Sequence, residues 1–160
     1  MHRFAVLTIW DKAYANKHED VSGKEIIKMA EGKGYSLVHY GILDNELPFV
    51  SAELVRLCDD NIADVVFTTG GTGLSTMDIT PEATLAVLER LFMGIPESLR
   101  IHSIKNTKSA MFSRAVAGTR GRTLIINLPG SPASVKDCME FLLEVLGDAL
   151  TTLKGSPIVV

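Results

Sequence analysis

The sequence has few of the features that mark several large classes of protein. Two cysteines, Cys58 and Cys138, occur in 160 residues, which excludes a disulfide framework and predicts two buried thiols in a reducing compartment. No apolar run reaches the ~20 residues that a membrane-spanning helix needs, and the apolar stretch at residues 4–9 is too short for a signal peptide. We therefore expect a cytoplasmic protein with no membrane partner.

Positive charge and histidine are also scarce. Lysine and arginine number 16 against 19 aspartate and glutamate residues, so the net charge is −3, and the basic surface typical of nucleic-acid binding is absent. The 4 histidines are scattered, without the spacing of metal ligands. No Ser-His-Asp arrangement is evident either. These absences favour small-molecule ligands and no nucleic-acid partner.

Hydrophobic side chains, by contrast, are plentiful. They make up 46% of the residues, which is enough to bury the core of one domain spanning residues 1–160. The mean hydropathy of +0.21 lies on the apolar side for a soluble protein and favours buried contacts between subunits. No linker, internal repeat or low-complexity block interrupts the chain.

Short apolar runs alternate along the chain with segments of helical periodicity. This alternation predicts an α/β protein, a three-layer α/β/α domain whose mostly parallel central sheet is covered on both faces. A β-hairpin is expected in the second half, and residues 151–160 show no clear period, as in a loose or docked tail. The expected strands are residues 4–9, 35–42, 64–67, 113–118 and 123–128, and the expected helices are residues 22–31, 49–61, 81–92, 96–105 and 132–146.

Three of these helices have recognisable starts. Ser22, Thr80 and Ser131 are the expected N-caps, because a hydroxyl oxygen accepts a bond from an unpaired N–H of the first turn. Pro81 and Pro132 suit the first helical position, where an N–H would have no partner. The positive end of a helix favours anions, so the helices that follow Thr80 and Ser131 are candidates for holding phosphate.

The stretch of residues 68–80 is the most distinctive one, because it joins a buried strand to a helix through three glycines in four positions. Glycine permits positive φ and lets a ligand approach the backbone, and successive N–H groups in such a loop form a concavity that binds anions. The spacing matches neither a Walker loop nor a Rossmann fingerprint. The candidate phosphate-binding residues are Gly70, Gly71, Thr72, Gly73 and Ser75.

One carboxylate, Asp78, follows the glycines. A carboxylate beside a phosphate is repelled unless a divalent cation lies between them, as Mg²⁺ does with one or two carboxylates. The alternative is a tight turn in which Asp78 is a capping or solvated residue. Ligands of parallel sheets bind beyond the carboxyl ends of the strands, and Asp44, in the turn after the second strand, belongs to the same edge. The loops expected there are residues 10–21, 43–46, 70–80 and 128–131.

Four segments together resemble the Mog/MoaB type of molybdenum-cofactor biosynthesis proteins, the molybdopterin adenylyltransferases. They are residues 68–73 with 78–84, residues 97–100, residues 112–115 and residues 128–132, in the order and spacing of that family. The resemblance implies a molybdopterin-binding fold, assembled as a homotrimer or homohexamer. It also implies an enzyme that binds ATP, Mg²⁺ and molybdopterin, transfers AMP to the terminal phosphate of molybdopterin and releases pyrophosphate.

The same resemblance implies roles for single residues. Asp44 and Asp78 would hold Mg²⁺ and position the nucleotide as the catalytic residues. Molybdopterin synthase or a molybdenum insertase would be protein partners. The positions implied to bind molybdopterin are Glu97, Arg100, Ser113, Arg114, Gly130 and Ser131. Simpler interpretations stay open: a strand hydroxyl for Ser113, an N-cap for Ser131, and a surface ion pair for Glu97 with Arg100.

The first loop departs from the family pattern. Trp10-Asp11-Lys12 stands where the family commonly has Ser-Asp-Arg, although Asp20-Val21-Ser22-Gly23 matches. A tryptophan in place of a small hydroxyl residue narrows or reshapes the pocket, and lysine lacks the bidentate fork of arginine. Two alternatives therefore stay open: a non-catalytic molybdopterin-binding or assembly protein of the MoaB type, and a nucleotide pyrophosphatase on the same fold, as in the related competence-damage proteins.

Overall fold

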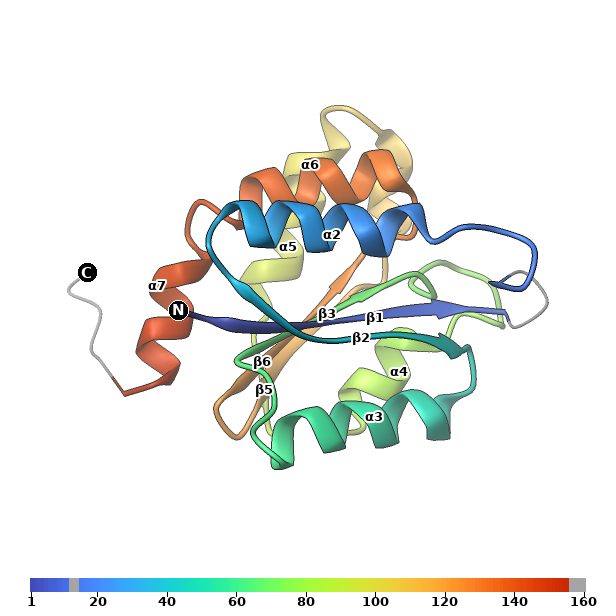
Figure 1. Ribbon diagram of the computed structural model, residues 1–160. Coiled ribbons are helices and arrows are strands. Elements are labelled where there is room, and N and C mark those ends of the chain that lie inside the picture. The colour runs from blue at the N-terminus through green and yellow to red at the C-terminus, as the bar shows by residue number, and fades with distance from the viewer. Residues whose placement is uncertain (12–14, 156–160) are drawn as a thin grey trace.

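A computed structural model describes residues 1–11 and 15–155 of the chain (Figure 1). Lys12 and residues 156–160, which the expectations for the first loop and the tail included, lie outside the described residues. A six-stranded sheet forms the centre, with strand order β2-β1-β3-β6-β5-β4. The strands are β1 (Arg3–Trp10), β2 (Ser36–Asp44), β3 (Val65–Thr69), β4 (Arg90–Leu91), β5 (Ala117–Arg120) and β6 (Thr123–Leu128).

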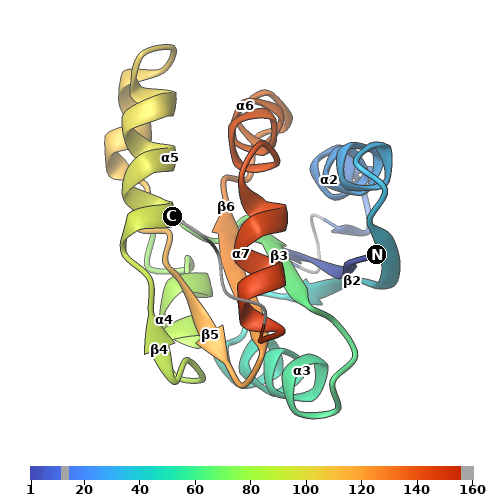
Figure 2. The same cartoon turned by 90° about the vertical axis from the view of Figure 1, so that its left-hand side faces the viewer.

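Helices cover both faces of this sheet, as Figures 1 and 2 show. One face carries α2 (Val21–Gly32), α5 (Gly94–Ile104) and α6 (Pro132–Leu142), and the other carries α3 (Leu47–Asp59) and α4 (Thr80–Leu85). A 3₁₀ helix, η1 (Lys108–Phe112), follows α5, and α7 (Leu146–Leu153) closes the described chain. The predicted three-layer α/β/α architecture is confirmed. Within the described residues, no helix is both long and apolar enough to cross a bilayer.

The sheet is mostly parallel. β1 pairs in parallel with β2 and β3, and β3 pairs in parallel with β6. β5 and β6 form the predicted antiparallel hairpin, and β4 adds a second antiparallel pair. The first hairpin strand is shorter than expected, because Arg114 leaves the sheet and donates its backbone N–H to the carbonyl of Thr72, 2.9 Å away. Arg114 thereby contacts the glycine-rich loop (residues 70–80), whereas Val116 still bonds to Asn127 of β6.

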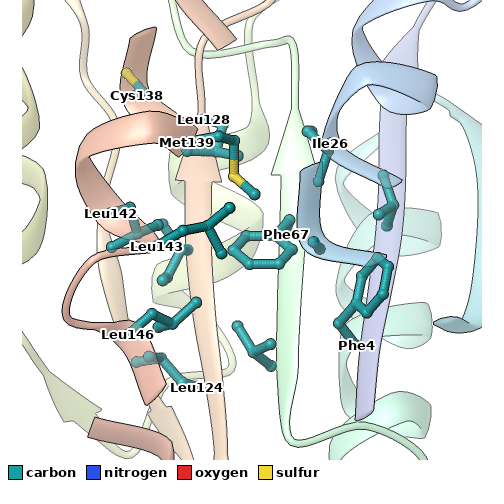
Figure 3. Packing of buried hydrophobic residues seen from close by; sticks show 14 of the residues in the cluster. Phe4, Ile26, Phe67, Leu124, Leu128, Cys138, Met139, Leu142, Leu143 and Leu146 are labelled. Carbon is teal, nitrogen blue, oxygen red and sulfur yellow. The ribbon is translucent and has the colours of Figure 1, made fainter. Parts of the chain in front are cut away.

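The apolar runs of the strands pack on both faces of the sheet. In β1, Phe4 and Val6 pack toward α2 and α6, whereas Leu7 and Ile9 pack toward α3. Figure 3 shows the first of these two clusters, in which Met139 lies near Phe67. Because parallel strands are covered on both sides, their sequences are continuously apolar and do not alternate.

Both cysteines are buried free thiols, as predicted. Cys58 belongs to the cluster beneath α3, and Cys138 to the cluster beneath α6. Burial raises the pKa of Cys58 to about 11 and also raises that of Cys138, so both thiols are protonated at neutral pH.

The prediction of a helix over residues 81–92 was wrong for the second half of that segment. α4 ends at Leu85, and Arg90–Leu91 forms β4 against β5, flanked by bonds from Glu89 N to Thr119 O and from Phe92 N to Ala117 O. The leucines at helical spacing also suit a short edge strand. This segment is a strand because it pairs with the backbone groups of β5 that would otherwise form an open sheet edge.

Two expected N-caps were also wrong. Thr80 lies inside α4, and its hydroxyl donates to the carbonyl of Gly70 at 2.9 Å. Asp20 caps α2 by accepting from Gly23 N, whereas the hydroxyl of Ser22 donates to Gly130 O at 2.7 Å. Both hydroxyls thus hold distant loops. Ser131 caps α6 as predicted, by accepting from Ser134 N.

The C-terminal part differs from the expectation in two further ways. The helix expected at residues 132–146 ends at Leu142, and a separate helix, α7, occupies Leu146–Leu153. Residues 151–153 are therefore helical, where a tail without regular structure was expected. The inner face of α7 supplies Leu146 and Leu150 to the core, and these two buried side chains hold a helix too short to be stable alone.

Candidate functional site

The expected loops meet at one edge of the sheet, beyond the carboxyl ends of the parallel strands (right-hand side of Figure 1). Asn45 links the loops after β1, β2 and β3, because its backbone N–H donates to Trp10 O at 3.2 Å and its side-chain amide to Met77 O at 3.0 Å. The bond from Ser22 to Gly130 adds the loop after β6. Topology and hydrogen bonds thus bring four segments far apart in sequence to one edge.

The glycine-rich loop requires glycine at its first two positions. Gly70 has φ +90° and Gly71 has φ +68°, a region that side chains disfavour. A Cβ at Gly70 would lie 2.5 Å from the backbone oxygen of Ile9, and one at Gly71 would lie 2.3 Å from Oγ1 of Thr80. Conformation and packing therefore both exclude larger residues here.

The carbonyl groups of this loop are bound from within the protein. Thr80 donates its hydroxyl to Gly70 O at 2.9 Å and its N–H to Gly71 O at 3.1 Å. Arg114 donates its N–H to Thr72 O at 2.9 Å and its Nε–H to Gly73 O at 2.7 Å. The amides of residues 71–73 have no acceptor among the described residues. With its oxygens bound, the loop offers N–H groups, which suit an anion.

Arg114 does more than hold two carbonyls. Its Nη2 donates to the backbone oxygen of Asp78 at 2.9 Å, and Nη1 pairs with the carboxylate of Glu82 at the start of α4. The bond from Arg114 lowers the pKa of Glu82. One guanidinium therefore connects the glycine-rich loop, the Asp78 backbone and α4. Arg114 is not among the residues that line the neighbouring cavity.

The two carboxylates predicted to act together are both half-buried at this edge. Asp44 is the last residue of β2, in register with Trp10, and not in the turn that was expected to follow the strand. Asp78 accepts the N–H of Ser75 at 3.0 Å, which closes the tip of the loop. In the part of the chain that the structure describes, no three His, Cys, Asp or Glu side chains form a metal cluster. A cation here would need further ligands from phosphate and water.

A cavity of about 230 Å³ lies beside the glycine-rich loop. Polar hydroxyl and amide groups share its wall with apolar side chains, a mixture typical of small-molecule sites. Thr72, Gly73, Arg100 and Ser113 are the site residues predicted from sequence that line it. The other lining residues are Pro96, Leu99, Ser103, Thr107, Ser109, Ala110, Phe112, Ala115, Asn127, Pro129, Ser134 and Cys138.

Asn127 is the most informative of the residues that sequence reasoning missed. It is 1% exposed, and its amide donates to the hydroxyls of Thr68 at 2.9 Å and Thr84 at 3.0 Å. Its side-chain oxygen accepts from Val116 N at 3.2 Å. A lone amide within the apolar strand β6 was the available signal, because buried polar groups need partners.

The remaining predicted residues surround the cavity in different ways. Arg100 donates to the carbonyls of Ser113 at 3.2 Å and Ala115 at 3.0 Å, so it holds the cavity wall in place. Glu97 is exposed and lies outside the lining, and the described ion pairs include none between it and Arg100. Gly130 and Ser131 are exposed at the start of α6. A Cβ at Gly130 would lie 3.4 Å from the Cα of Gly70.

A second hollow of about 450 Å³ lies at the ends of β1 and β2. It is lined by Trp10, Ala15, Asn16, Ile42, Leu43, Asp44 and Phe49. The edge therefore has two recesses, one beside α5 and α6 and one beside β2, and Asp44 belongs to the second.

A buried acidic group, Asp20, supports the loops from beneath. It is 3% exposed and accepts from the hydroxyls of Thr8 at 2.5 Å and Tyr40 at 2.7 Å and from Gly23 N at 2.8 Å. Burial and the bond to Asp20 raise the pKa of Tyr40. These bonds fix the start of α2, from which Ser22 reaches Gly130.

Comparison with known proteins identifies the class to which this fold and site belong. Residues 5–148 match the molybdenum-cofactor biosynthesis family described as "Probable molybdopterin binding domain", and the chain belongs to that family. The predicted resemblance is thereby confirmed.

Two bacterial molybdopterin adenylyltransferases are among its relatives. The chain is 37% identical over 155 residues to the molybdopterin adenylyltransferase of Helicobacter pylori strain J99, which covers 94% of this chain and 87% of the relative. It is 32% identical to that of Escherichia coli K12 over 153 residues, 92% of this chain and 77% of the relative. The solved structure of the molybdopterin biosynthesis enzyme MoaB of Thermus thermophilus superposes with TM-score 0.90 at 38% identity, covering 98% and 99% of the two chains.

Proposed function

We propose that this protein is a molybdopterin adenylyltransferase, which transfers AMP from Mg-ATP to the terminal phosphate of molybdopterin and releases pyrophosphate. Family membership and the named relatives support the chemistry. The observation in this chain that supports the proposal is the glycine-rich loop. Its carbonyl oxygens accept hydrogen bonds from Thr80 and Arg114, so its N–H groups can bind a phosphate beside Asp78.

The reaction needs positioning more than covalent chemistry. An ionised phosphate oxygen of molybdopterin attacks the α-phosphorus of ATP, one P–O bond forms, and the bond to pyrophosphate breaks. No proton must be removed from that oxygen, so the protein has to align the two substrates and offset the charge between them. The amides of residues 71–73 and the hydroxyl of Thr72 are suited to this task.

Asp44 and Asp78 are the proposed Mg²⁺ ligands. Two carboxylates at one edge suit this cation, which is usually bound through one or two carboxylates and substrate phosphates. When bound, Mg²⁺ would reduce the negative charge that repels the two phosphates from each other. Arg114 fixes Asp78 through its backbone oxygen and so positions the carboxylate relative to the loop.

Molybdopterin is assigned to the 230 Å³ cavity. Hydroxyls of Thr107, Ser109 and Ser113 suit the polar edge of a pterin, and Phe112 and Leu99 suit its flat face. Thr72 and Gly73 line the same cavity, which would bring the terminal phosphate of molybdopterin to the glycine-rich loop. Ser131 and Gly130, at the start of α6, are proposed to bind at its mouth.

The setting of the enzyme is part of the same proposal. We assign it to the cytoplasm, as a homotrimer or homohexamer that contacts molybdopterin synthase or a molybdenum insertase. Exposed apolar side chains on the α5–α6 side, such as Ile101 at 65% and Val145 at 60% exposure, support a surface covered by another subunit.

Pyrophosphate release in the presence of ATP, Mg²⁺ and molybdopterin tests the function. We expect turnover by the wild-type protein and a loss of roughly 10²-fold or more in Asp78→Asn, because an electrostatic group at the reacting centre is removed. Asp60→Asn, which alters an exposed carboxylate at the end of α3, is the matched control and should turn over normally.

The alternatives predict different outcomes of this experiment. Molybdopterin binding without pyrophosphate release would indicate a non-catalytic binding protein of the MoaB type. Hydrolysis of a dinucleotide without molybdopterin would indicate a nucleotide pyrophosphatase. Normal turnover by Asp78→Asn would remove this carboxylate from the mechanism.

A further inference from the structure

One carboxylate, that of Asp137, bonds α5 to α6 on the side of the 230 Å³ cavity that these two helices form. One of its oxygens lies 3.0 Å from Nε2 of His102 and 3.3 Å from Nδ2 of Asn106. The other oxygen accepts from the hydroxyl of Ser103 at 3.1 Å. Asp137 does not line the cavity itself, so it acts on the cavity through the residues that it bonds.

Ser103 and Cys138 extend this network to the cavity wall, which both residues line. The hydroxyl oxygen of Ser103 lies 3.5 Å from the sulfur of Cys138. Both residues are buried, and Figure 3 shows the side chain of Cys138 pointing away from Met139 in the core. The contacts proposed above for molybdopterin include neither residue.

The carboxylate fixes the direction of these hydrogen bonds. Because a carboxylate only accepts, the single proton of the Ser103 hydroxyl points toward Asp137. The oxygen of Ser103 then accepts the S–H of Cys138, a thiol that keeps its proton because burial raises its pKa. The sulfur is left with its lone pairs, which accept weakly. Hydroxyl groups elsewhere in the wall can rotate to donate or accept, whereas this sulfur can only accept.

We propose that Asp137 is a positioning residue for molybdopterin, which turns the S–H of Cys138 away from the cavity and leaves the sulfur to accept an N–H of the pterin. This inference rests on the proposed function, which assigns molybdopterin to this cavity. A wall that accepts at one fixed point favours one orientation of the ring. The opposite orientation would leave a buried polar group unpaired, which is costly.

Asp137→Asn tests the direction of the hydrogen bonds with little change of shape. The remaining oxygen stays with His102 and Asn106, so the amide nitrogen faces Ser103 and donates to it. The proton of Ser103 then goes to the sulfur, and the S–H turns into the cavity. Calorimetry should show roughly 10-fold weaker binding of molybdopterin, because a donor then faces the N–H of the pterin.

Two comparisons show whether this loss is specific. The kcat for pyrophosphate release should change less than about two-fold in Asp137→Asn, because the glycine-rich loop is unaltered. Glu140→Gln is the matched control, since Glu140 is an exposed carboxylate of the same helix, 4.0 Å from Lys136. This variant should bind molybdopterin like the wild type.

A double substitution separates the orientation of the thiol from simple support of α5. Cys138→Ala removes the acceptor and should also weaken molybdopterin binding roughly 10-fold. If Asp137 acts through the sulfur, the double variant should bind like Cys138→Ala alone. Losses that multiply to roughly 100-fold would mean that Asp137 only supports the helix, and they would overturn the proposal.

The S–H stretching band in the infrared spectrum gives a measurement that needs no substrate. The chain has 2 cysteines, so Cys58→Ala, in the separate cluster beneath α3, leaves Cys138 as the single thiol. In that background, Asp137→Asn should shift the band, because the S–H changes its partner, and Glu140→Gln should leave it in place. An unshifted band in Asp137→Asn would overturn the proposal.

These results also separate the inference from the proposed function. Unchanged molybdopterin affinity in Asp137→Asn and Cys138→Ala, with pyrophosphate release intact, would refute the role of the sulfur and leave the adenylyltransferase assignment standing. A protein without turnover whose molybdopterin affinity still depends on both residues would support the inference and refute the assignment.

Discussion

The two ends of the parallel sheet are held together by different interactions. At the carboxyl ends, Arg114 and Thr80 bind backbone oxygens of the glycine-rich loop, and amides remain without acceptors in the described chain. At the amino ends, Asp64 accepts from Arg3 at 2.9 Å and from Lys154 of α7 at 2.7 Å. One end is thus closed by ion pairs within the chain, and the other keeps donors for a ligand.

The closed end shows how charge is used for stability. Asp64 is 6% exposed, and burial alone would oppose its ionisation. The side chain and backbone N–H of Arg3 and the ammonium of Lys154 outweigh that cost and lower the pKa of Asp64 from 3.8 to about 2. All its donors come from within the chain, whereas the amides of residues 71–73 at the other end have no such partner among the described residues.

The largest expected difference in turnover between the two ends comes from substituting alanine for a glycine of positive φ. Gly71 at the open end has φ +68° and Gly121 in the β5–β6 hairpin has φ +56°. Both substitutions incur the left-handed strain of about 1 kcal/mol. Only at Gly71 would the Cβ also meet Oγ1 of Thr80, at 2.3 Å, while nothing lies within 4 Å at Gly121. Pyrophosphate release should therefore fall roughly 10²-fold in Gly71→Ala and stay near wild type in Gly121→Ala.

Thermal unfolding of both variants provides the control. The hydroxyl that a Cβ at Gly71 displaces is the one bonded to Gly70, so the damage should be local to the loop. An equal loss of turnover in both variants would mean that strain anywhere in the fold impairs catalysis. The contrast between the two ends would then be wrong.

The fold could be predicted from the sequence because each of its main signals is local. β-branched runs covered on both faces, as in Val65–Thr69, predict a buried parallel strand, and the Pro132 start of α6 follows from cap chemistry. The segment at Arg90–Leu91 could not be predicted, because its structure depends on the free edge of β5. The same holds for Thr80 and Ser22, whose hydroxyls bind loops distant in sequence.

The sequence predicted those parts of the candidate site that lie at the carboxyl ends of the parallel strands. The rule for parallel sheets brought the end of β2 at Asp44 and the loop of Asp78 to one edge, where Asn45 connects them. The cavity wall from α5 and η1 depends on how these helices lie against α6, and no local pattern encodes that arrangement. Ser103 and Thr107 were missed for this reason.

Arg114→Lys should weaken the support of the glycine-rich loop and lower turnover less than Gly71→Ala does. Lysine keeps the charge but cannot donate at once to Gly73 O, Asp78 O and Glu82, as the guanidinium does. We expect kcat for pyrophosphate release to fall on the order of 10-fold or more, because the loop and Asp78 lose their common support. The KM for molybdopterin should be unchanged, since Arg114 does not line the cavity.

A kinetic split tests this role against direct contact with molybdopterin. If Arg114 binds the pterin, Arg114→Lys should raise the KM for molybdopterin and affect kcat less. Arg120→Lys is the matched control, because Arg120 forms a fork with Asp59 at 2.8 Å in both bonds, remote from the glycine-rich loop. Its turnover should match that of the wild type.

Asp64→Asn should have the smallest effect on turnover, and its effect on stability should depend on pH. Because the pKa of Asp64 falls from 3.8 to about 2 on folding, the ionised group stabilises the fold above pH 3.8 by about 2 kcal/mol. This stabilisation is lost as the pH falls through 3.8 toward 2. Urea unfolding of wild type and variant should therefore differ constantly from pH 7 to about 5 and converge near pH 2.

The matched control for this last prediction is Asp59→Asn. Asp59 also pairs with an arginine, Arg120, but its side chain is 49% exposed, so solvent screens this ion pair and it should stabilise the fold less than the ion pairs of Asp64 do. Pyrophosphate release should be unchanged in both variants, because Asp64 directly precedes β3, at the end of this strand opposite the glycine-rich loop. A loss of turnover in Asp64→Asn without a loss of folded protein would show that the two ends are coupled. The ion pairs would then serve catalysis as well as stability.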